Sequence, residues 1–203
     1  MKKTVFSDEK LFLVQQSHNA QNNRVYSVAF EDLPEEVRTV QRFQNLNAVM
    51  VWGAISEKGK LALIFIDRGV KINKEYYQRE ILESVLKPEA RRLFPEGGWT
   101  FQQDSAPAHK AKVNQEWCKV NCPSFIGEHE WPPSSPDLNP LNYCIWGLLE
   151  SKVNAKPHRS LESLKNTLVR EWSKLSMKTV RAAIASWRDR LKCVVDANGG
   201  RFE

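Results

Sequence analysis

Two aspartates in this sequence each follow a short stretch that is typical of a β-strand. Asp8 follows residues 4–7, and Asp104 follows residues 99–103. We therefore expect both carboxylates at strand ends. In sheets flanked by helices, functional sites gather at such ends, and two carboxylates brought together there can share a divalent metal ion that offsets their mutual repulsion. Aspartate is also a common turn residue, so either one taken alone would more often be a surface residue.

A third candidate position follows a proline-rich segment, residues 131–140, which holds four prolines and two serines. Such a segment forms neither a helix nor a central strand. Asn139 is a favourable N-cap and Pro140 a favourable first helical residue, so a helix is predicted to begin there. Asn142 then lies in the first turn, beside the positive end of the helix dipole. A carboxylate at this place could share metal ions with the two aspartates.

The elements that position these residues are predicted from apolar periodicity and turn residues. We expect strands at 4–7, 11–14, 24–28, 47–55, 61–66, 99–103 and 125–130, a turn at 58–60, and helices after Asn73, at 108–120, at 141–153 and twice more before the end of the chain. Pro88 is expected to interrupt the first of these helices. Antiparallel strands followed by alternating strands and helices predict an α/β protein with a mixed sheet and helices on its faces.

Three blocks of sequence are specific in combination. They are Phe6-Ser7-Asp8-Glu9, the block from Phe101 to His109, and the block from Trp131 to Pro140. Together they closely resemble the catalytic domain of mariner-superfamily transposases, and residues 51–55 and 143–146 also fit. The resemblance covers about residues 4 to 175.

The resemblance implies a ribonuclease H-like fold, with a mixed five-stranded sheet flanked by helices. We expect residues 1–203 to form a single catalytic domain. Within it, about 17–44 would be a long insertion between strands, and about 158–203 would be C-terminal helices. The helix-turn-helix domains that precede the catalytic core in the family are absent from this sequence, so we do not expect it to bind DNA sequence-specifically.

In the family, an acidic triad holds two Mg²⁺ ions, for which Mn²⁺ can substitute. Asp8 matches the first acid, Asp104 the second and Asn142 the position of the third. A spacing of 37 residues separates Asp104 from Asn142, as in a mariner-like subgroup whose third residue is aspartate. Asparagine keeps the shape of aspartate and removes its charge, so we expect impaired catalysis. Natural decay, domestication or a deliberate inactivating change would each leave an asparagine here.

The resemblance implies the catalytic core of a cut-and-paste DNA transposase. Two-metal hydrolysis would cut phosphodiester bonds at transposon ends, and strand transfer would join them to target DNA. The expected partner is therefore DNA, with a homodimer in the DNA complex and a nuclear location. A net charge of +6 favours a polyanionic partner, although many basic proteins bind no nucleic acid.

Five residues are candidates for DNA contact. Lys152, Lys156 and Arg159 follow the third block and are interpreted as phosphate contacts, although a solvated helix face explains most of the late basic residues equally well. Trp131 is a candidate for stacking on a frayed base. His109 is assigned to DNA contact or positioning rather than to general base catalysis, because metal ions supply that role in two-metal chemistry.

Other classes of protein are excluded or ranked lower. No apolar run approaches the roughly 20 residues of a membrane span, and four cysteines are too few for a disulfide framework. A non-catalytic DNA-binding or assembly module, derived from a domesticated transposase, stays open as an alternative to an enzyme. A ribonuclease H-like nuclease acting on RNA would fit the fold but not the proline-rich block.

Overall fold

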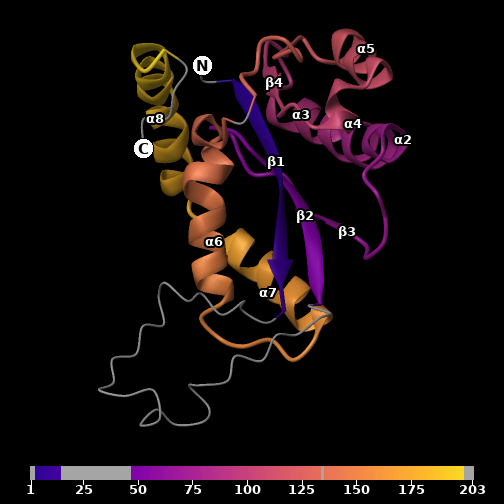
Figure 1. Cartoon of the computed structure of the whole chain (residues 1–203), viewed down its shortest axis with the longest axis vertical. Helices are drawn as coiled ribbons and strands as arrows, with labels where there is room; N and C mark the ends of the chain where they lie inside the picture. The colour runs from indigo at the N-terminus through magenta and orange to yellow at the C-terminus, as the bar shows by residue number, and fades with distance from the viewer. Residues whose placement is uncertain (1–2, 15–46, 134, 199–203) are drawn as a thin grey trace, which may run out of the picture.

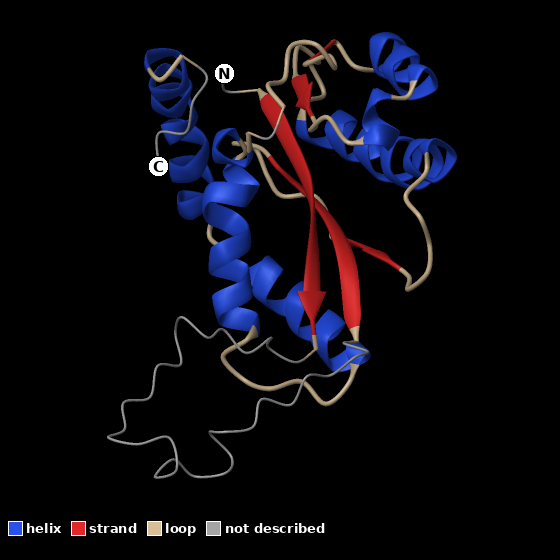
Figure 2. Ribbon diagram, in the orientation of Figure 1, coloured by secondary structure: helices blue, strands red, loops and turns tan. Residues whose placement is uncertain are grey.

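The centre of the molecule is a mixed sheet of five strands in the order β3-β2-β1-β4-β5 (Figure 2). The computed structural model describes residues 3–14, 47–133 and 135–198, so the predicted strand at 24–28 and the predicted insertion at 17–44 lie outside the described residues. The strands are β1 (Thr4–Leu13), β2 (Ala48–Ile55), β3 (Ile64–Ile66), β4 (Thr100–Gln102) and β5 (Ser124–Phe125). The first three pair antiparallel, and β4 and β5 run parallel to β1. The predicted mixed five-stranded sheet is confirmed.

Helices cover both faces of this sheet (Figure 1). They are α2 (Lys74–Tyr76), the π-helix η2 (Tyr77–Leu86), α3 (Lys87–Leu93), α4 (Pro107–Lys110), α5 (Lys112–Asn121), the 3-10 turn η3 (Pro136–Leu138), the π-helix η4 (Leu141–Ile145), α6 (Trp146–Val153), α7 (Leu161–Lys174) and α8 (Met177–Asp196). One hydrophobic core joins η2, α3 and α5 to one face, and a second joins α6, α7 and α8 to the other. Among the described helices, none is long and apolar enough to cross a membrane.

The central strand β1 sends alternate side chains into the two cores. Phe6 and Phe12 pack on the α6 side, whereas Val5 packs on the η2 side. Because the side-chain period of a strand is two, Asp8 shares the α6 side and Glu9 the opposite one. The sequence predicted two short strands with Asp8 at a strand end, and this was wrong. Continuous pairing with β2, from Phe6 opposite Ile55 to Leu13 opposite Ala48, carries one strand through the charged positions.

Two helices differ from their predicted limits. In both, hydrogen bonds other than the usual backbone bond from residue i to residue i−4 explain the difference. Pro88 does not interrupt the helix after Asn73, because the wider turns of η2 precede it and the Lys87 N–H reaches back five residues to Leu82. The predicted helix 108–120 is broken at Ala111, where ψ is 130°.

Side chains replace the missing helical bonds at this break. The Asn114 amide donates to the carbonyl of Ala108 at 2.8 Å, and the Gln115 amide donates to the carbonyl of His109 at 2.8 Å. The single turn α4 is therefore held separately from α5. As a result, His109, which follows Ala108, can face the interior.

Candidate active site

The parallel pairing of β1 with β4 brings the two aspartates together. Phe6 lies opposite Gln102 in this ladder, and each aspartate follows two residues later, Asp8 within β1 and Asp104 just beyond the end of β4. Neighbouring strands lie about 4.8 Å apart, so Asp8 and Asp104 come side by side where β4 ends. Asp8 is buried with 7% of its surface exposed, whereas the side chain of Asp104 is 43% exposed. Asp104 therefore follows the end of its strand, as predicted, and Asp8 meets it from the middle of β1.

Asp8 accepts a hydrogen bond from the indole of Trp146, the first residue of α6, with 2.7 Å between Nε1 and Oδ2. Gly53 makes this approach possible, because it lies directly opposite Asp8 on β2. A Cβ atom at Gly53 would lie 2.7 Å from Cη2 of the Trp146 ring. Glycine thus leaves the space through which the α6 helix reaches the carboxylate.

The surroundings of Asp8 disfavour its charge. Burial raises the pKa of Asp8 to about 7, and the nearby charges of Glu9 and Asp104 add to the increase. Hydrogen bonds from the side chains of Trp146 and Asn142 oppose it in part. Both of these donors are neutral, so the carboxylate is placed where a bound cation would stabilise it.

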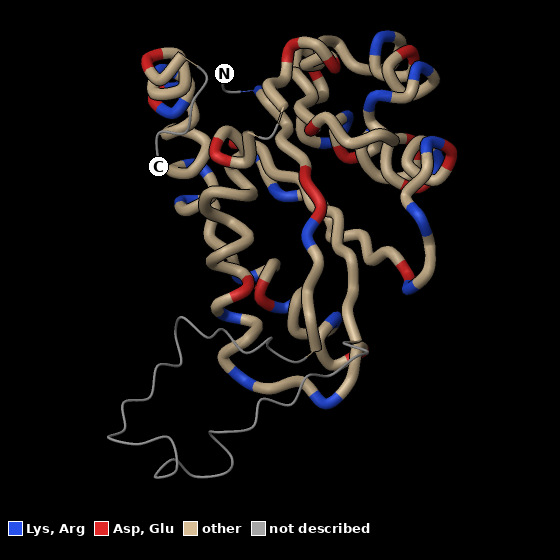
Figure 3. Tube along the Cα trace, in the orientation of Figure 1, with Lys and Arg blue, Asp and Glu red and all other residues tan. Residues whose placement is uncertain are grey.

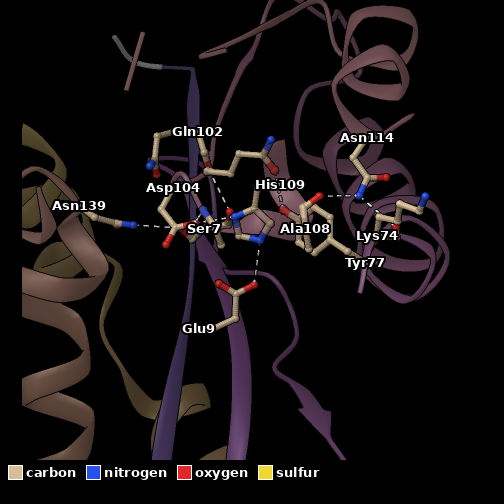
Figure 4. Close-up of polar contacts among 12 residues, drawn as sticks. Ser7, Glu9, Lys74, Tyr77, Gln102, Asp104, Ala108, His109, Asn114 and Asn139 are labelled. Atoms are coloured by element: carbon tan, nitrogen blue, oxygen red, sulfur yellow. Dashed lines mark hydrogen bonds and ion pairs between the residues drawn. The ribbon is translucent and has the colours of Figure 1, made fainter. Parts of the chain in front are cut away.

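Asp104 has a different environment (Figure 4). Its Oδ1 accepts the backbone N–H of Ala106 at 2.9 Å and lies 2.6 Å from Nδ1 of His109. The other ring nitrogen of His109, Nε2, lies 3.3 Å from Oε1 of Glu9. Burial disfavours charge on both groups, but their hydrogen bonds outweigh it: the pKa of Asp104 is lowered, and the pKa of His109 is raised to about 10 by Asp104 and Glu9.

The segment that carries Asn142 is anchored to β1 by Asn139. The Asn139 amide donates to the carbonyl of Ser7 at 2.9 Å, and its Oδ1 accepts the backbone N–H of Leu141 at 3.0 Å. This side chain caps the start of the helix while tying it to the central strand. The predicted helix start at Asn139 and Pro140 is confirmed, and Asn142 in the first turn hydrogen-bonds Asp8.

Helix α8 supports the same segment from outside. The hydroxyl of Tyr143 donates to the carbonyl of Ala183 at 2.6 Å. Arg190 lies over the Tyr143 ring, 3.9 Å from its centroid, and donates to the carbonyl of Asp137 at 3.1 Å. Helix α8, one of the C-terminal helices predicted within 158–203, therefore holds the turn that carries Asn142.

A pocket of about 400 Å³ connects these positions to the proline-rich segment. It is lined by Asp104, Ser105, Ala106, Lys110, Trp131, Pro132, Pro133, Ser135, Pro136, Asn139 and Asn142. Trp131 is only 6% exposed, so it forms part of the pocket wall. Its predicted stacking on a base would have to occur inside this pocket.

The other predicted DNA contacts lie away from the pocket. Lys152, Lys156 and Arg159 are exposed, but Lys152 is ten residues beyond Asn142, which corresponds to about 15 Å along a helix. Figure 3 shows the basic positions after α6 beyond the end of that helix, away from the acidic stretch in the middle of β1. His109 is 3% exposed and has a carboxylate at each ring nitrogen, so the structure argues against its predicted DNA contact.

Sequence comparison identifies the family. The family model described as DDE superfamily endonuclease matches residues 3–165 of this chain. The chain belongs to this family. Among curated relatives, the DDE domain is 32% identical to the Transposable element Tc3 transposase of Caenorhabditis elegans over 201 residues, covering 97% of this chain and 56% of the relative. It is 31% identical to the Transposable element Tcb1 transposase of Caenorhabditis briggsae over 152 residues, covering 75% and 53%.

Structural comparison supports the fold. The Mos1 mariner paired end complex with Mn matches with a TM-score of 0.80 and 21% identity, covering all of this chain and 57% of the matched chain. A form of this complex with Mg matches with a TM-score of 0.75 and 20% identity, covering 99% and 57%. The predicted ribonuclease H-like fold is therefore confirmed. The DDE domain spans a little over half the length of the curated relatives it matches.

Three residues around the site were not predicted from the sequence. Glu9, Gly53 and Trp146 all contact the candidate residues or make room for them. Trp146 could have been found, because it lies four residues after Asn142 and so shares its helix face. The roles of Glu9 and Gly53 depend on strand pairing and on helices far along the chain, for which the sequence holds no local signal.

Proposed function

We propose that this DDE domain is the catalytic core of a cut-and-paste DNA transposase, and that Asn142 impairs its chemistry. The observation that carries the proposal is the meeting of Asp8, Asp104 and Asn142 from three separate elements, with Asp104 and Asn142 lining one pocket. The family match and the transposase relatives support the same conclusion.

The donor atoms fit a hard divalent cation. Two carboxylates and one amide oxygen are ligands of the kind that Mg²⁺ and Mn²⁺ take. The raised pKa of Asp8 indicates a carboxylate that lacks a positive neighbour. Within the described residues, no group of three or more His, Cys, Asp or Glu side chains is placed to hold a metal.

Bound ions, two per site in our proposal, would activate a water or a DNA 3′-hydroxyl and stabilise the leaving oxygen. Asp8 and Asp104 would supply the negative charge that holds them, and Asn142 would offer a neutral oxygen. The site therefore has one negative charge fewer than an intact triad. Lys110, which lines the pocket, is positioned to pair with a phosphate of the substrate.

DNA is the proposed partner, as transposon ends and as target. The solved Mos1 complexes contain paired ends, which supports a homodimer of this chain in its DNA complex. We also propose a nuclear location, because transposition acts on genomic DNA. Lys152, Lys156 and Arg159 would contact phosphates outside the pocket, and Trp131 would stack on a base within it.

The test is nicking of supercoiled plasmid DNA in Mg²⁺ and in Mn²⁺ by the chain and by its Asn142→Asp variant. Changing groups that merely support a metal ligand costs about 10- to 100-fold, so restoring a ligand should raise the rate by about 100-fold or more. The double variant Asn142→Asp, Asp104→Asn is the matched control and should not cut. If the chain and Asn142→Asp cut equally well, residue 142 is not part of the site.

Asn142 also supports a second candidate, a non-catalytic DNA-binding or assembly module. If neither the chain nor Asn142→Asp cuts while both bind DNA, this second function is correct and the catalytic proposal fails.

A further inference from the structure

Asp104 is held by a buried polar group that has no place among the proposed metal ligands. His109 lies between Asp104 and Glu9, with Nδ1 at 2.6 Å from the first and Nε2 at 3.3 Å from the second. These two carboxylates come from different elements: Glu9 lies on the face of β1 opposite Asp8, and Asp104 follows β4. One imidazole ring therefore links the opposite face of the sheet to the candidate site (Figure 4).

The contacts of Asp104 are unequal between its two oxygens. Oδ1 accepts from both the Ala106 backbone and His109, at 2.9 and 2.6 Å. Among the described residues, Oδ2 has no hydrogen-bond partner, and Asp104 lines the pocket. Two donors on one oxygen fix the rotation of a carboxylate, since each hydrogen bond prefers a defined direction. The second oxygen is thereby left to the pocket.

The position of the His109 ring is itself fixed. The ring of Tyr77 packs against it with 4.2 Å between centroids, and the Tyr77 hydroxyl donates to Oε1 of Gln103 at 2.7 Å. Its backbone lies in the single turn α4, where the Gln115 amide holds the His109 carbonyl. With Glu9 at the far nitrogen, the ring is held by packing, by its backbone and by an ion pair.

We propose that His109, braced by Glu9, is a positioning residue that orients the Asp104 carboxylate so that Oδ2 points into the pocket as a metal ligand. This inference rests on the proposed function, because it takes Asp104 as a ligand. Groups that hydrogen-bond metal-ligating carboxylates tune metal affinity through the ligand's orientation. If His109 only packed against Tyr77, an apolar side chain would be enough at this position, and contact with the two carboxylates would not be needed.

Two amide substitutions separate the two contacts of the ring. The amide nitrogen of asparagine matches Nδ1 of histidine, so His109→Asn keeps a donor for Asp104 and loses the contact with Glu9. The amide nitrogen of glutamine matches Nε2, so His109→Gln keeps the contact with Glu9 and loses that with Asp104. His109→Leu fills the space beside Tyr77 and donates to neither. All three are made in the Asn142→Asp background.

The measurement is the dissociation constant for Mn²⁺, from the electron paramagnetic resonance signal of the free ion, with the melting temperature in EDTA recorded beside it. We expect His109→Gln and His109→Leu to bind Mn²⁺ about 10- to 100-fold more weakly than the Asn142→Asp parent. His109→Asn should stay within about threefold of that parent, since it retains the bond to the ligand. The amide pair decides the question even if His109→Leu does not fold.

Equal Mn²⁺ affinity for His109→Asn and His109→Gln, or weaker binding by His109→Asn, overturns the inference and leaves the proposed function standing. A separate control detects failure of the proposed function. If the Asn142→Asp parent binds Mn²⁺ no better than its Asp104→Asn derivative, Asp104 is not a ligand and both conclusions fail.

Discussion

Asp8 and Glu9 are consecutive residues of one strand, yet their surroundings are opposite in kind. Asp8 faces α6 and meets two neutral donors, the Trp146 indole and the Asn142 amide. Glu9 faces α4 and meets His109, whose pKa is raised to about 10. Glu9 therefore has a cationic partner within the chain, whereas Asp8 does not.

On the proposed function, this difference separates the acid that supports the site from the acid that would bind the metal. A carboxylate paired with a cation inside the protein stabilises the fold it belongs to. A buried carboxylate without one lowers stability until an external cation binds. The comparison predicts that neutral replacements at the two neighbouring positions change the free energy of unfolding in opposite directions.

The largest expected effect comes from disturbing the α6 side of β1. In Gly53→Ala the new methyl group meets the Trp146 ring at 2.7 Å and the Leu63 side chain at 3.1 Å. Overpacking of this kind lowers the free energy of unfolding by about 1 to 3 kcal/mol, and we expect the upper end because the ring must leave Asp8. Urea unfolding measures it.

The matched control for this substitution is Gly147→Ala in α6, where no atom lies within 4 Å of the added group. Alanine is the better helix former, so this change should raise stability by about 0.5 to 1 kcal/mol. Equal losses in the two variants would mean that the contact between β1 and α6 is looser than the structure indicates.

A smaller effect of opposite sign is expected for Asp8→Asn. The folded pKa of Asp8 is raised from 3.8 to about 7, so its ionisation lowers stability progressively as pH rises through this range. At pH 8 Asp8 is ionised, and a neutral amide that still accepts the Trp146 hydrogen bond should raise stability by about 2 kcal/mol in EDTA, which is less than the roughly 4 kcal/mol of the full shift because an amide accepts weaker hydrogen bonds than a carboxylate. Thermal unfolding with and without Mn²⁺ should also show that the variant loses any stabilisation by the metal. If Asp8→Asn is less stable than the parent chain in EDTA, the contrast drawn between Asp8 and Glu9 is wrong.

The smallest effect is expected for Glu9→Gln. The amide oxygen still faces His109, but a charge-assisted contact becomes a neutral one, so stability should fall by about 1 kcal/mol. Thermal unfolding in EDTA, under the conditions used for Asp8→Asn, gives the comparison directly. If Glu9→Gln stabilises the chain as Asp8→Asn does, the ion pair with His109 does not stabilise this face.

The sequence predicted the parts of the site that depend on local signals. The strand before Asp104, the cap at Asn139 and the helix start at Pro140 each rest on a few adjacent residues, and all three are confirmed. The strand through Asp8 was missed because three charged residues, 8–10, are typical of a turn, and pairing with a partner strand overrides that preference.

What could not be predicted depends on contacts between distant segments. The contact between His109 and Glu9 could not be predicted, because nothing near His109 in the sequence indicates that Glu9 lies opposite. Pro88 was predicted to interrupt its helix, because nothing in the adjacent sequence indicates the π-helical turns that precede it. In each case a partner far along the chain, or an uncommon hydrogen-bond pattern, decides the outcome.

The anchoring of the third position by Asn139 has a consequence for how such a domain loses function. The helix start is held by the Asn139 side chain and by backbone bonds, so the fold does not depend on a carboxylate at residue 142. On the proposed function, a copy with asparagine there keeps its shape and its surfaces while losing its chemistry. In the proposed homodimer, such a copy would pair with an active one and place a site that does not cleave in the same complex.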